Sequence, residues 1–496
     1  MKRLNLFIYL VLAGLLYTNC VSTKQTPQAA MAPLPSTFAV IPDSLKMASA
    51  GDSTAAKQKE DSSTVAAINW REYFKDSTLI GLIDTALKNN LDIQVAYQRI
   101  LVARANVKRT KGASAPFISG AVSAGQQNYG DYTQEGVGNY DTNFSPNVTD
   151  EQHMSPDLRD LYLRLETSWE VDAWGKLKNK RRAAKAKYLA SVEGKNWVVT
   201  NMIAEIATTF YELLALDYEL SIINETIILQ TNQLSIVETQ KEAGRANELA
   251  VKQFEAQVLH SKGLQIEISQ RIVEAENRIN YLLGRFPQPI ERDVNHFILT
   301  SPQQISVGIP SNLLSNRPDI KQAEYELKAS KANVKAAKAA FYPSLTITGA
   351  LGFRSFNPNY FITPQALVNN IFGGLVAPLV NQSAIKASFR TAKAEQVEAM
   401  YNYQKAILNG YIEVYNQMVY INNLNRIYDL KDQEVAVLTT SIETASELFL
   451  TGRATYLEII ITRSAALQSR LELINIKKRQ FNSVVNIYKA LGGGWK

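Results

Sequence analysis

The sequence predicts a mixed, mainly α-helical fold in which very long helices are combined with four short β-strands in two similar halves. Three observations predict it. Short motifs recur at constant offsets along the chain, which indicates an internal two-fold repeat. Apolar residues recur every three or four positions over segments much longer than an ordinary helix. Four short segments between turn residues read as strands, and two of them alternate clearly between apolar and polar side chains.

The first 19 residues have the pattern of a lipoprotein signal peptide. Lys2 and Arg3 precede an apolar run over residues 4–16, which is too short to span a membrane. Cys20 is the only cysteine among 496 residues, so an intrachain disulfide is excluded. A lipoprotein signal leaves such a cysteine as the acylated N-terminus, and we predict a covalent lipid on Cys20 and no other cofactor. A cysteine that is removed with an ordinary signal peptide is the alternative.

Residues 20–68 are expected to form a lipidated, flexible tether. Residues 21–66 are rich in Ser, Thr, Ala, Pro and Gln, a composition typical of segments with little fixed structure. The whole chain is 46% apolar and 20% charged, as folded proteins are. Its net charge of +7 does not predict nucleic-acid binding, because the basic residues are spread along helices among many acids and an exported chain meets no nucleic acid.

Two pairs of motifs define the repeat. NLDIQVAYQ, from Asn90, is similar to RPDIKQAEY, from Arg317, at an offset of 227 residues. GRANEL, from Gly244, is similar to GRATYL, from Gly452, at an offset of 208 residues. The first copy therefore contains about 19 additional residues. We place them in a longer loop at 128–157, where Gly, Asn, Asp, Tyr and Pro are frequent.

Each copy has the same order of elements: a helix, two strands, a very long helix, a Gly-Arg-Ala turn and a last helix. The opening helices are expected over 79–112 and 319–341, and each is followed by a proline boundary. The predicted organisation is a first repeat at 69–284 with strands at about 117–127 and 160–173, an inter-repeat linker at 285–318, and a second repeat at 319–496 with strands at about 344–354 and 371–381.

The long helix of the first copy carries an apolar stripe that includes Ile203, Ile206 and Phe210, the pattern of helices packed side by side. A single helix over 176–239 would be roughly 95 Å long. The last helix of this copy is expected over 246–283. A globular core needs no helix of such length, whereas a device that crosses a wide space does.

Two strand segments, LYLRLETSWEVD and SLTITGALGF, have one apolar face and one polar or small face. Each has about the ten residues that a tilted outer-membrane strand requires. A soluble sheet with one wet face would alternate in the same way. Four strands cannot close a barrel, and open sheet edges are not tolerated in lipid. If these strands lie in a bilayer, several chains must contribute to one barrel.

One long segment carries a family resemblance. LLSNRPDIKQAEYELKASKANVKAAKAAFYPSLTITG, at 313–349, resembles the hallmark segment of the TolC-like outer-membrane efflux protein family, in the lipoprotein branch of RND-type efflux outer-membrane factors. SWEVDAWGKL resembles the family's strand-to-helix junction, and NYLLGRFP and YKALGGGW resemble its helix ends. The resemblance covers about 69–496. The chain departs from the family pattern at PLVNQSAIK, from Pro378, where the strand-to-helix turn before the second long helix is expected.

The resemblance implies a homotrimer with a 12-stranded transmembrane β-barrel and a hollow helical barrel in the periplasm. It implies a lipid-anchored protein of the bacterial outer membrane that contacts outer-membrane lipid. Its partners would be a periplasmic adaptor (membrane fusion) protein and an inner-membrane RND transporter. The function would be that of an exit duct in a tripartite efflux pump, which passively exports small molecules such as drugs and is not an enzyme.

Two other functions stay open at this point: a TolC-like duct of a type I protein secretion system, and a periplasmic coiled-coil adaptor or scaffold without a pore. No catalytic or phosphate-binding motif is present. His153, His260 and His296 are too scattered in the sequence to indicate a metal site.

A basic segment follows the second strand. Residues 176–187 contain seven Lys or Arg residues and no acid, which is unfavourable at a helix N-terminus. We expect this patch to contact lipid phosphates at the inner leaflet, or acids on a neighbouring helix. A solvated basic face is the alternative. The candidate residues are Lys176, Lys178, Lys180, Arg181 and Arg182.

The two Gly-Arg-Ala turns lie at the ends of the long helices farthest from the strands. Gly244 and Gly452 suit the left-handed helix ending that such turns use. Arg245 and Arg453 are candidates for linking neighbouring helices or an adaptor. Glu458 has no Lys or Arg three or four residues away, and copies of it around an aperture would favour cations. The alternative for Glu458 is an ordinary solvated helix-surface glutamate.

Overall fold

The computed structural model describes residues 35, 68–155, 157–293, 297, 310–378, 380 and 382–495. The signal peptide, Cys20 and most of the tether lie outside these residues, as do parts of the linker. The chain divides into two compact units, 1–35 and 36–496, and the description below concerns the second alone. None of the helices described combines the length and the apolarity that a membrane span requires.

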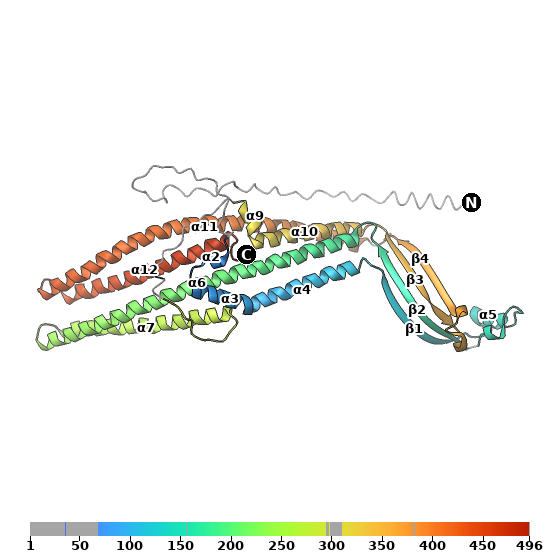
Figure 1. Cartoon of the computed structure of the whole chain (residues 1–496), viewed down its shortest axis with the longest axis horizontal. Helices are drawn as coiled ribbons and strands as arrows, with labels where there is room; N and C mark the ends of the chain where they lie inside the picture. The colour runs from blue at the N-terminus through green and yellow to red at the C-terminus, as the bar shows by residue number, and fades with distance from the viewer. Residues whose placement is uncertain are drawn as a thin grey trace. The chain divides into compact units, whose positions relative to one another are not determined.

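The fold is mainly helical with one four-stranded sheet, which confirms the predicted fold class at this level (Figure 1). Two short helices, α2 (Trp70–Tyr73) and α3 (Ser77–Asn89), precede the repeats. The first copy consists of α4 (Leu91–Gly112), β1 (Phe117–Asn128), β2 (Asp157–Val171), α6 (Lys176–Glu242) and α7 (Glu248–Leu282). After α9 (Asn312–Asn316), the second copy consists of α10 (Pro318–Ala339), β3 (Ser344–Ser355), β4 (Leu367–Val376), α11 (Ser383–Leu450) and α12 (Tyr456–Ala490).

The two longest helices, α6 and α11, organise the helical part into two rows. They contain 67 and 68 residues, which corresponds to roughly 100 Å each. On the side of the sheet, neighbours contact one another in the order α4, α6, α10, α11. On the side of the Gly-Arg-Ala turns, the order is α7, α6, α12, α11. The shorter helices of each copy therefore lie along different halves of the same two long helices (Figure 1).

The sheet is antiparallel throughout, with strand order β1-β2-β3-β4. Its register places Val122, Leu163, Phe353 and Leu367 in one row across the sheet. Tyr162 and Arg354 are paired at adjacent positions and therefore lie on the opposite face. The face that carries Leu163 is mainly apolar. The opposite face is polar or small on β2 and β3, although Val368 and Phe372 of β4 also lie on it. Within the described part of this chain, β1 and β4 each have one edge without a partner strand.

Two predicted boundaries are corrected by the structure. The expected helix over 79–112 is two helices, because Asn90 has an extended backbone conformation and caps α4 with its side chain. The last strand, expected at 371–381, is β4 at Leu367–Val376. The chain leaves β3 through short turns that already place Leu367 opposite Phe353. Pro378, which has no N–H for a strand ladder, follows soon after β4 ends.

The long loop of the first copy, expected at 128–157, contains a helix of its own. This is α5 (Gln134–Asn143), capped by Thr133, whose side chain accepts a hydrogen bond from Gly136 N. A short 3-10 turn, η3 (Asp150–Gln152), follows it. The additional residues of the first copy therefore form an ordered connection between β1 and β2.

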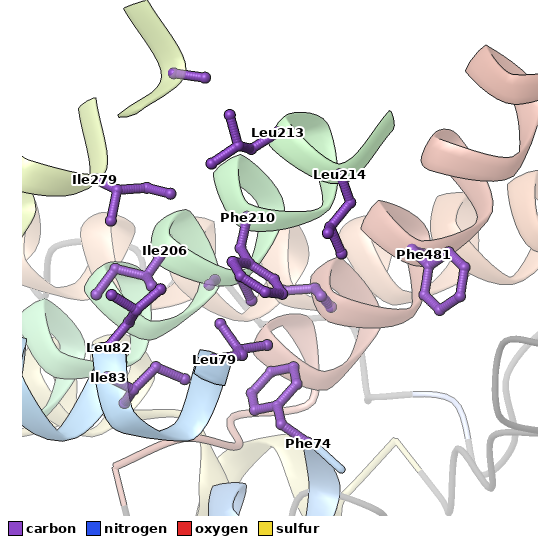
Figure 2. Packing of buried hydrophobic residues seen from close by; sticks show 14 of the residues in the cluster. Phe74, Leu79, Leu82, Ile83, Ile206, Phe210, Leu213, Leu214, Ile279 and Phe481 are labelled. Atoms are coloured by element: carbon purple, nitrogen blue, oxygen red, sulfur yellow. The ribbon is translucent and has the colours of Figure 1, made fainter. Parts of the chain in front are cut away.

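The main hydrophobic core lies where α3 and α7 meet α6 and α12. Phe210 of α6 is fully buried and lies among Leu79, Ile83 and Ile279 (Figure 2). Phe481 of α12 stacks on Tyr211, with ring centroids 4.7 Å apart. Since a buried apolar side chain of this size contributes about 1.5–3 kcal/mol, this cluster holds the two copies together at the middle of the long helices.

In the second copy, a buried arginine links three helices. Arg317, which is 2% exposed, donates to Glu413 Oε2 of α11 at 2.7 Å and to the Ala490 carbonyl of α12 at 2.7 Å. Its other nitrogens bind Asp319 at 3.0 and 2.7 Å. One side chain thus joins the start of α10, the middle of α11 and the end of α12.

The first copy has a matching contact at the equivalent position. Asn90, which lies 227 residues before Arg317, donates through Nδ2 to the Leu282 carbonyl at 2.8 Å. Leu282 lies 208 residues before Ala490, so both copies tie the same two helix ends together. The repeat seen in the sequence is therefore repeated in the hydrogen bonds.

We expect Arg317→Ala to lower the free energy of unfolding by about 3 kcal/mol. The value is at the low end for a broken buried ion pair, because Asp319 and Glu413 are partly exposed. Denaturant titration in detergent, followed by circular dichroism, measures it. Arg278→Ala is the matched control: it breaks an exposed ion pair with Glu205, and the expected loss is about 0–1 kcal/mol. Equal losses in the two variants would contradict the assigned role of Arg317.

Candidate functional site

The two Gly-Arg-Ala sequences form the same turn. Gly244 and Gly452 have φ values of 70° and 72°, in the left-handed region that favours glycine. Arg245 N donates to the Gln240 carbonyl, and Arg453 N donates to the Leu448 carbonyl, each at 2.8 Å. This is the hydrogen-bond pattern of a Schellman helix ending, so both glycines have the structural role that the sequence predicts.

The two turns lie next to each other because they share a small apolar core. Val237, Val251 and Phe254 of the first turn region are buried against Tyr456 and Ile460 of α12. The residues that the sequence places at the two turns are thus brought together at one end of the helical rows. We call this end the tip.

The tip arginines are not part of this core. Arg245 and Arg453 are exposed, and neither makes an ion pair with any residue in the described part of the chain. Their predicted role in linking helices is therefore not fulfilled within one copy. It stays a prediction for contacts between copies or with another protein.

Glu458 has a partner three residues away, Thr455, which a search for nearby Lys or Arg residues could not reveal. Its carboxylate accepts hydrogen bonds from Thr455 N, at 2.7 Å, and from Thr455 Oγ1, so that Thr455 and Glu458 form a capping box for α12. The Thr455 hydroxyl is the main reason why the pKa of Glu458 lies below its usual value. The sequence TYLE contains the T-x-x-E signal of this motif. Glu458 is thus an ionised, exposed cap at the tip.

At the opposite end of α6, the acids that offset the basic segment come from the end of β2. Asp172 accepts hydrogen bonds from Leu177 N at 2.9 Å and from Lys178 N at 2.6 Å, and so caps α6. Glu170 forms an ion pair with Lys176. Among the described residues, no acid of a neighbouring helix forms an ion pair with the basic segment. Arg181 and Arg182 are exposed and have no ion pair among them.

A stacked aromatic pair lies beside the basic segment and was not predicted. Trp174 and Tyr342 have ring centroids 5.0 Å apart and are 51% and 46% exposed. Trp174 Nε1 donates to the Pro343 carbonyl at 2.6 Å, which links the end of β2 to the start of β3. The two residues are 168 positions apart in the sequence, so no local pattern could predict that they stack.

The structure brings no metal-binding group together in the residues that it describes. His153 follows η3 and His260 lies on α7, while His296 is outside the described residues. The candidate sites in the described residues therefore consist of the two turns at the tip, the basic segment and the sheet.

Comparison with known proteins decides the family. Residues 82–285 and 309–493 match the family described as outer membrane efflux protein. The chain belongs to this family. It is therefore an outer-membrane protein of a family of efflux channels.

Curated relatives cover nearly the whole chain. The cation efflux system protein CusC of Escherichia coli O6:H1 is 27% identical over 428 residues, which are 86% of this chain and 88% of the relative. SilC of Salmonella typhimurium, described as a probable outer membrane lipoprotein, is 26% identical over 100% of this chain and 99% of its own. The solvent efflux pump outer membrane protein SrpC of Pseudomonas putida is 26% identical over 86% of this chain and 87% of its own.

Solved structures share the fold. A membrane protein from Pseudomonas aeruginosa gives a TM-score of 0.81 at 20% identity and covers 93% of this chain and 98% of its own. A crystal structure of CusC gives 0.76 at 24% identity, covering 86% and 95%. The match to the outer membrane efflux protein family, rather than the shared fold, favours a channel over the scaffold without a pore.

We expect Glu458→Gln to weaken cation preference and block by divalent cations in single-channel recordings, with unchanged thermal stability. Glutamine keeps the capping hydrogen bond but removes the charge. Glu458→Ala removes both and should also lower stability.

The matched control for this prediction is Glu248→Gln. Glu248 lies in the first turn of α7, and its charge is already paired with Lys241. Cation preference should therefore be unchanged in that variant. Unaltered selectivity in Glu458→Gln would place Glu458 outside the conducting path and make Arg245 and Arg453 the next candidates.

Proposed function

We propose that the protein is the outer-membrane exit duct of a tripartite efflux pump, through which small molecules such as drugs leave the cell passively. One observation carries the proposal: a two-faced, open four-stranded sheet continues into helices of roughly 100 Å. The apolar face suits lipid and the polar face suits an aqueous conduit. The long helices suit the distance across the periplasm.

The open sheet edges call for other copies of the chain. In lipid, the unpaired N–H and C=O groups along β1 and β4 would be costly. Pairing β1 of one copy with β4 of the next satisfies both edges. Three copies of four strands would give a barrel of 12 strands, and we propose this homotrimer.

The partners proposed for the duct are a periplasmic adaptor (membrane fusion) protein and an inner-membrane RND transporter. Two described relatives are named for cation efflux and solvent efflux, and each is named as part of an efflux system or pump. The tip, with Arg245, Arg453 and Glu458 exposed, is the surface that we propose for the adaptor. A lipid on Cys20 would hold the chain to the outer membrane as an auxiliary anchor. The relative SilC is named as a probable outer membrane lipoprotein.

We expect the purified full chain to run as a heat-resistant trimer and to produce stepwise conductance in planar lipid bilayers. A closed barrel satisfies every strand hydrogen bond and so resists dissociation. Mass measurement in detergent gives the number of copies, and bilayer recordings give the conductance. A monomer without conductance would contradict the duct and would favour a scaffold.

We expect radiolabelled palmitate to label the wild type and Ser22→Ala but not Cys20→Ser, because Cys20 is the only thiol in the chain. The trimer should form in all three proteins, since the barrel anchors itself in the membrane. Loss of the trimer in Cys20→Ser alone would mean that the lipid is needed for assembly.

A further inference from the structure

The ends of four helices next to the sheet form a continuous basic region, which we call the collar. It consists of residues 101–112 of α4, 176–192 of α6, 327–340 of α10 and 383–394 of α11. These helices are neighbours in the order α4, α6, α10, α11, and each of the four segments leads into or out of a strand. Figure 1 shows the four helices meeting the strands at the same end.

The collar contains 18 Lys or Arg residues and no Asp or Glu. Among the described residues, only two of these 18 form ion pairs, Lys176 with Glu170 and Lys328 with Glu324, and both acids lie outside the collar. The other half of the long helices is different, because acids and bases alternate there, as in the pairs of Lys431 with Glu434 and Glu472. The spread of basic residues among acids that the sequence indicates therefore holds for most of the chain but not for this end, which has 18 of the 53 basic residues and no acid among them.

The basic side chains form stripes rather than a random scatter. On α10, Lys328, Lys331, Lys335 and Lys338 recur at spacings of three and four, and all are exposed. Such spacing puts them on one face of the helix. The alanines at the intervening positions of α10 are mostly buried. The stripe is therefore held outward by the packing of α10 on its neighbours.

Helix polarity explains only half of this charge. Basic residues are favourable at the C-terminal ends of α4 and α10 but unfavourable at the N-terminal ends of α6 and α11. Asp172 offsets the first turn of α6, whereas α11 has no acid in its first turn and no side-chain cap. Lys386 and Arg390 nevertheless occupy its first two turns. A negative partner outside the chain would account for this arrangement.

The position of the collar identifies the partner. Lys111, Lys176 and Lys338 are each within six residues of a strand end, and most of the intervening residues are turns between helix and strand. These basic side chains therefore lie next to the level where the strands end, where a lipid headgroup layer about 5–7 Å thick would begin. The exposed pair Trp174 and Tyr342 lies at the same level, as aromatic residues do at membrane–water interfaces.

We propose that the collar binds the phosphates of anionic phospholipids in the periplasmic leaflet of the outer membrane. The proposal rests on the proposed function, because it requires the sheet to lie in that membrane. Each Lys or Arg near an anionic surface increases binding about fivefold, and the effect decays within a Debye length of about 8–10 Å. The nearest basic residues would contact headgroups, and the more distant ones would add to the attraction.

The test compares lipids retained by the full-length oligomer. The wild type and a variant with Arg181, Arg182, Lys331 and Lys335 changed to Gln are reconstituted in phosphatidylcholine vesicles with or without 30% phosphatidylglycerol, a composition chosen as roughly that of an anionic membrane surface. Phosphatidylglycerol retained after detergent extraction is counted by native mass spectrometry. The matched control changes Lys241, Lys252, Lys262 and Arg278 to Gln, which removes the same charge from the exposed surface of the other half.

The wild type and the control should retain phosphatidylglycerol over phosphatidylcholine at least fivefold, and the collar variant should lose this preference. High salt should reduce it in the wild type. If a conducting wild-type oligomer retained both lipids equally, the proposed lipid binding by the collar would be wrong, while the proposed function as a duct would still stand. Absence of conductance in either lipid would instead count against the duct. A third outcome would also contradict lipid binding. If the wild type shows no lipid preference but binds lipid-free peptidoglycan sacculi, and the collar variant does not, the partner of the collar is the cell wall.

Discussion

The fold depends on how the ends of the shorter helices are fastened to the middle of the long ones. In the second copy, the buried guanidinium of Arg317 binds two carboxylates and the terminal carbonyl of α12. An unsatisfied carbonyl at a buried helix end would be costly, and a buried charge without partners would cost more. The contact satisfies both groups at once. It also marks the position along α6 and α11 at which their neighbour changes from α12 to α10.

The same fastening in the first copy uses a smaller group. Asn90 caps α4 and donates to Leu282, and Gly284 and Gly492 allow the chains to approach closely after each helix end. A Cβ on Gly284 would lie 2.7 Å from the Asn89 carbonyl oxygen, and one on Gly492 would lie 2.6 Å from the Asn316 carbonyl carbon. Two similar joints therefore divide each long helix into a half that leads to the sheet and a half that leads to the tip. This division gives the chain two ends with different chemistry.

Charge is distributed along the helices according to these two ends. Next to the sheet the collar is basic, in the middle Arg292 joins Asp217 of α6 to Glu276 of α7, and at the tip charges of both signs are exposed, on Arg245, Arg453 and Glu458. Glu219, near the middle, is buried, and burial is the main reason why its pKa is raised. Charges between helices thus act as links in the middle, whereas at the ends they remain available to partners. A duct that contacts lipid at one end and protein at the other would use such a distribution.

The sequence alone determined the elements of local origin. The long apolar stripes, the alternating strands and the two glycine turns each depend on residues close together in the chain. The repeat offsets compare such local motifs across 208 or 227 positions, and together these patterns predicted the fold class and the roles of Gly244 and Gly452. The T-x-x-E cap of Glu458 was also readable locally, although charge spacing missed it. The break at Asn90 is local as well, because this residue caps α4 through Ile93 N. The tertiary structure decided the contacts of Arg317 with Glu413 and Ala490, the Trp174–Tyr342 pair and the collar. These bring together residues tens to hundreds of positions apart, and their energies arise only when packing brings separate helices side by side.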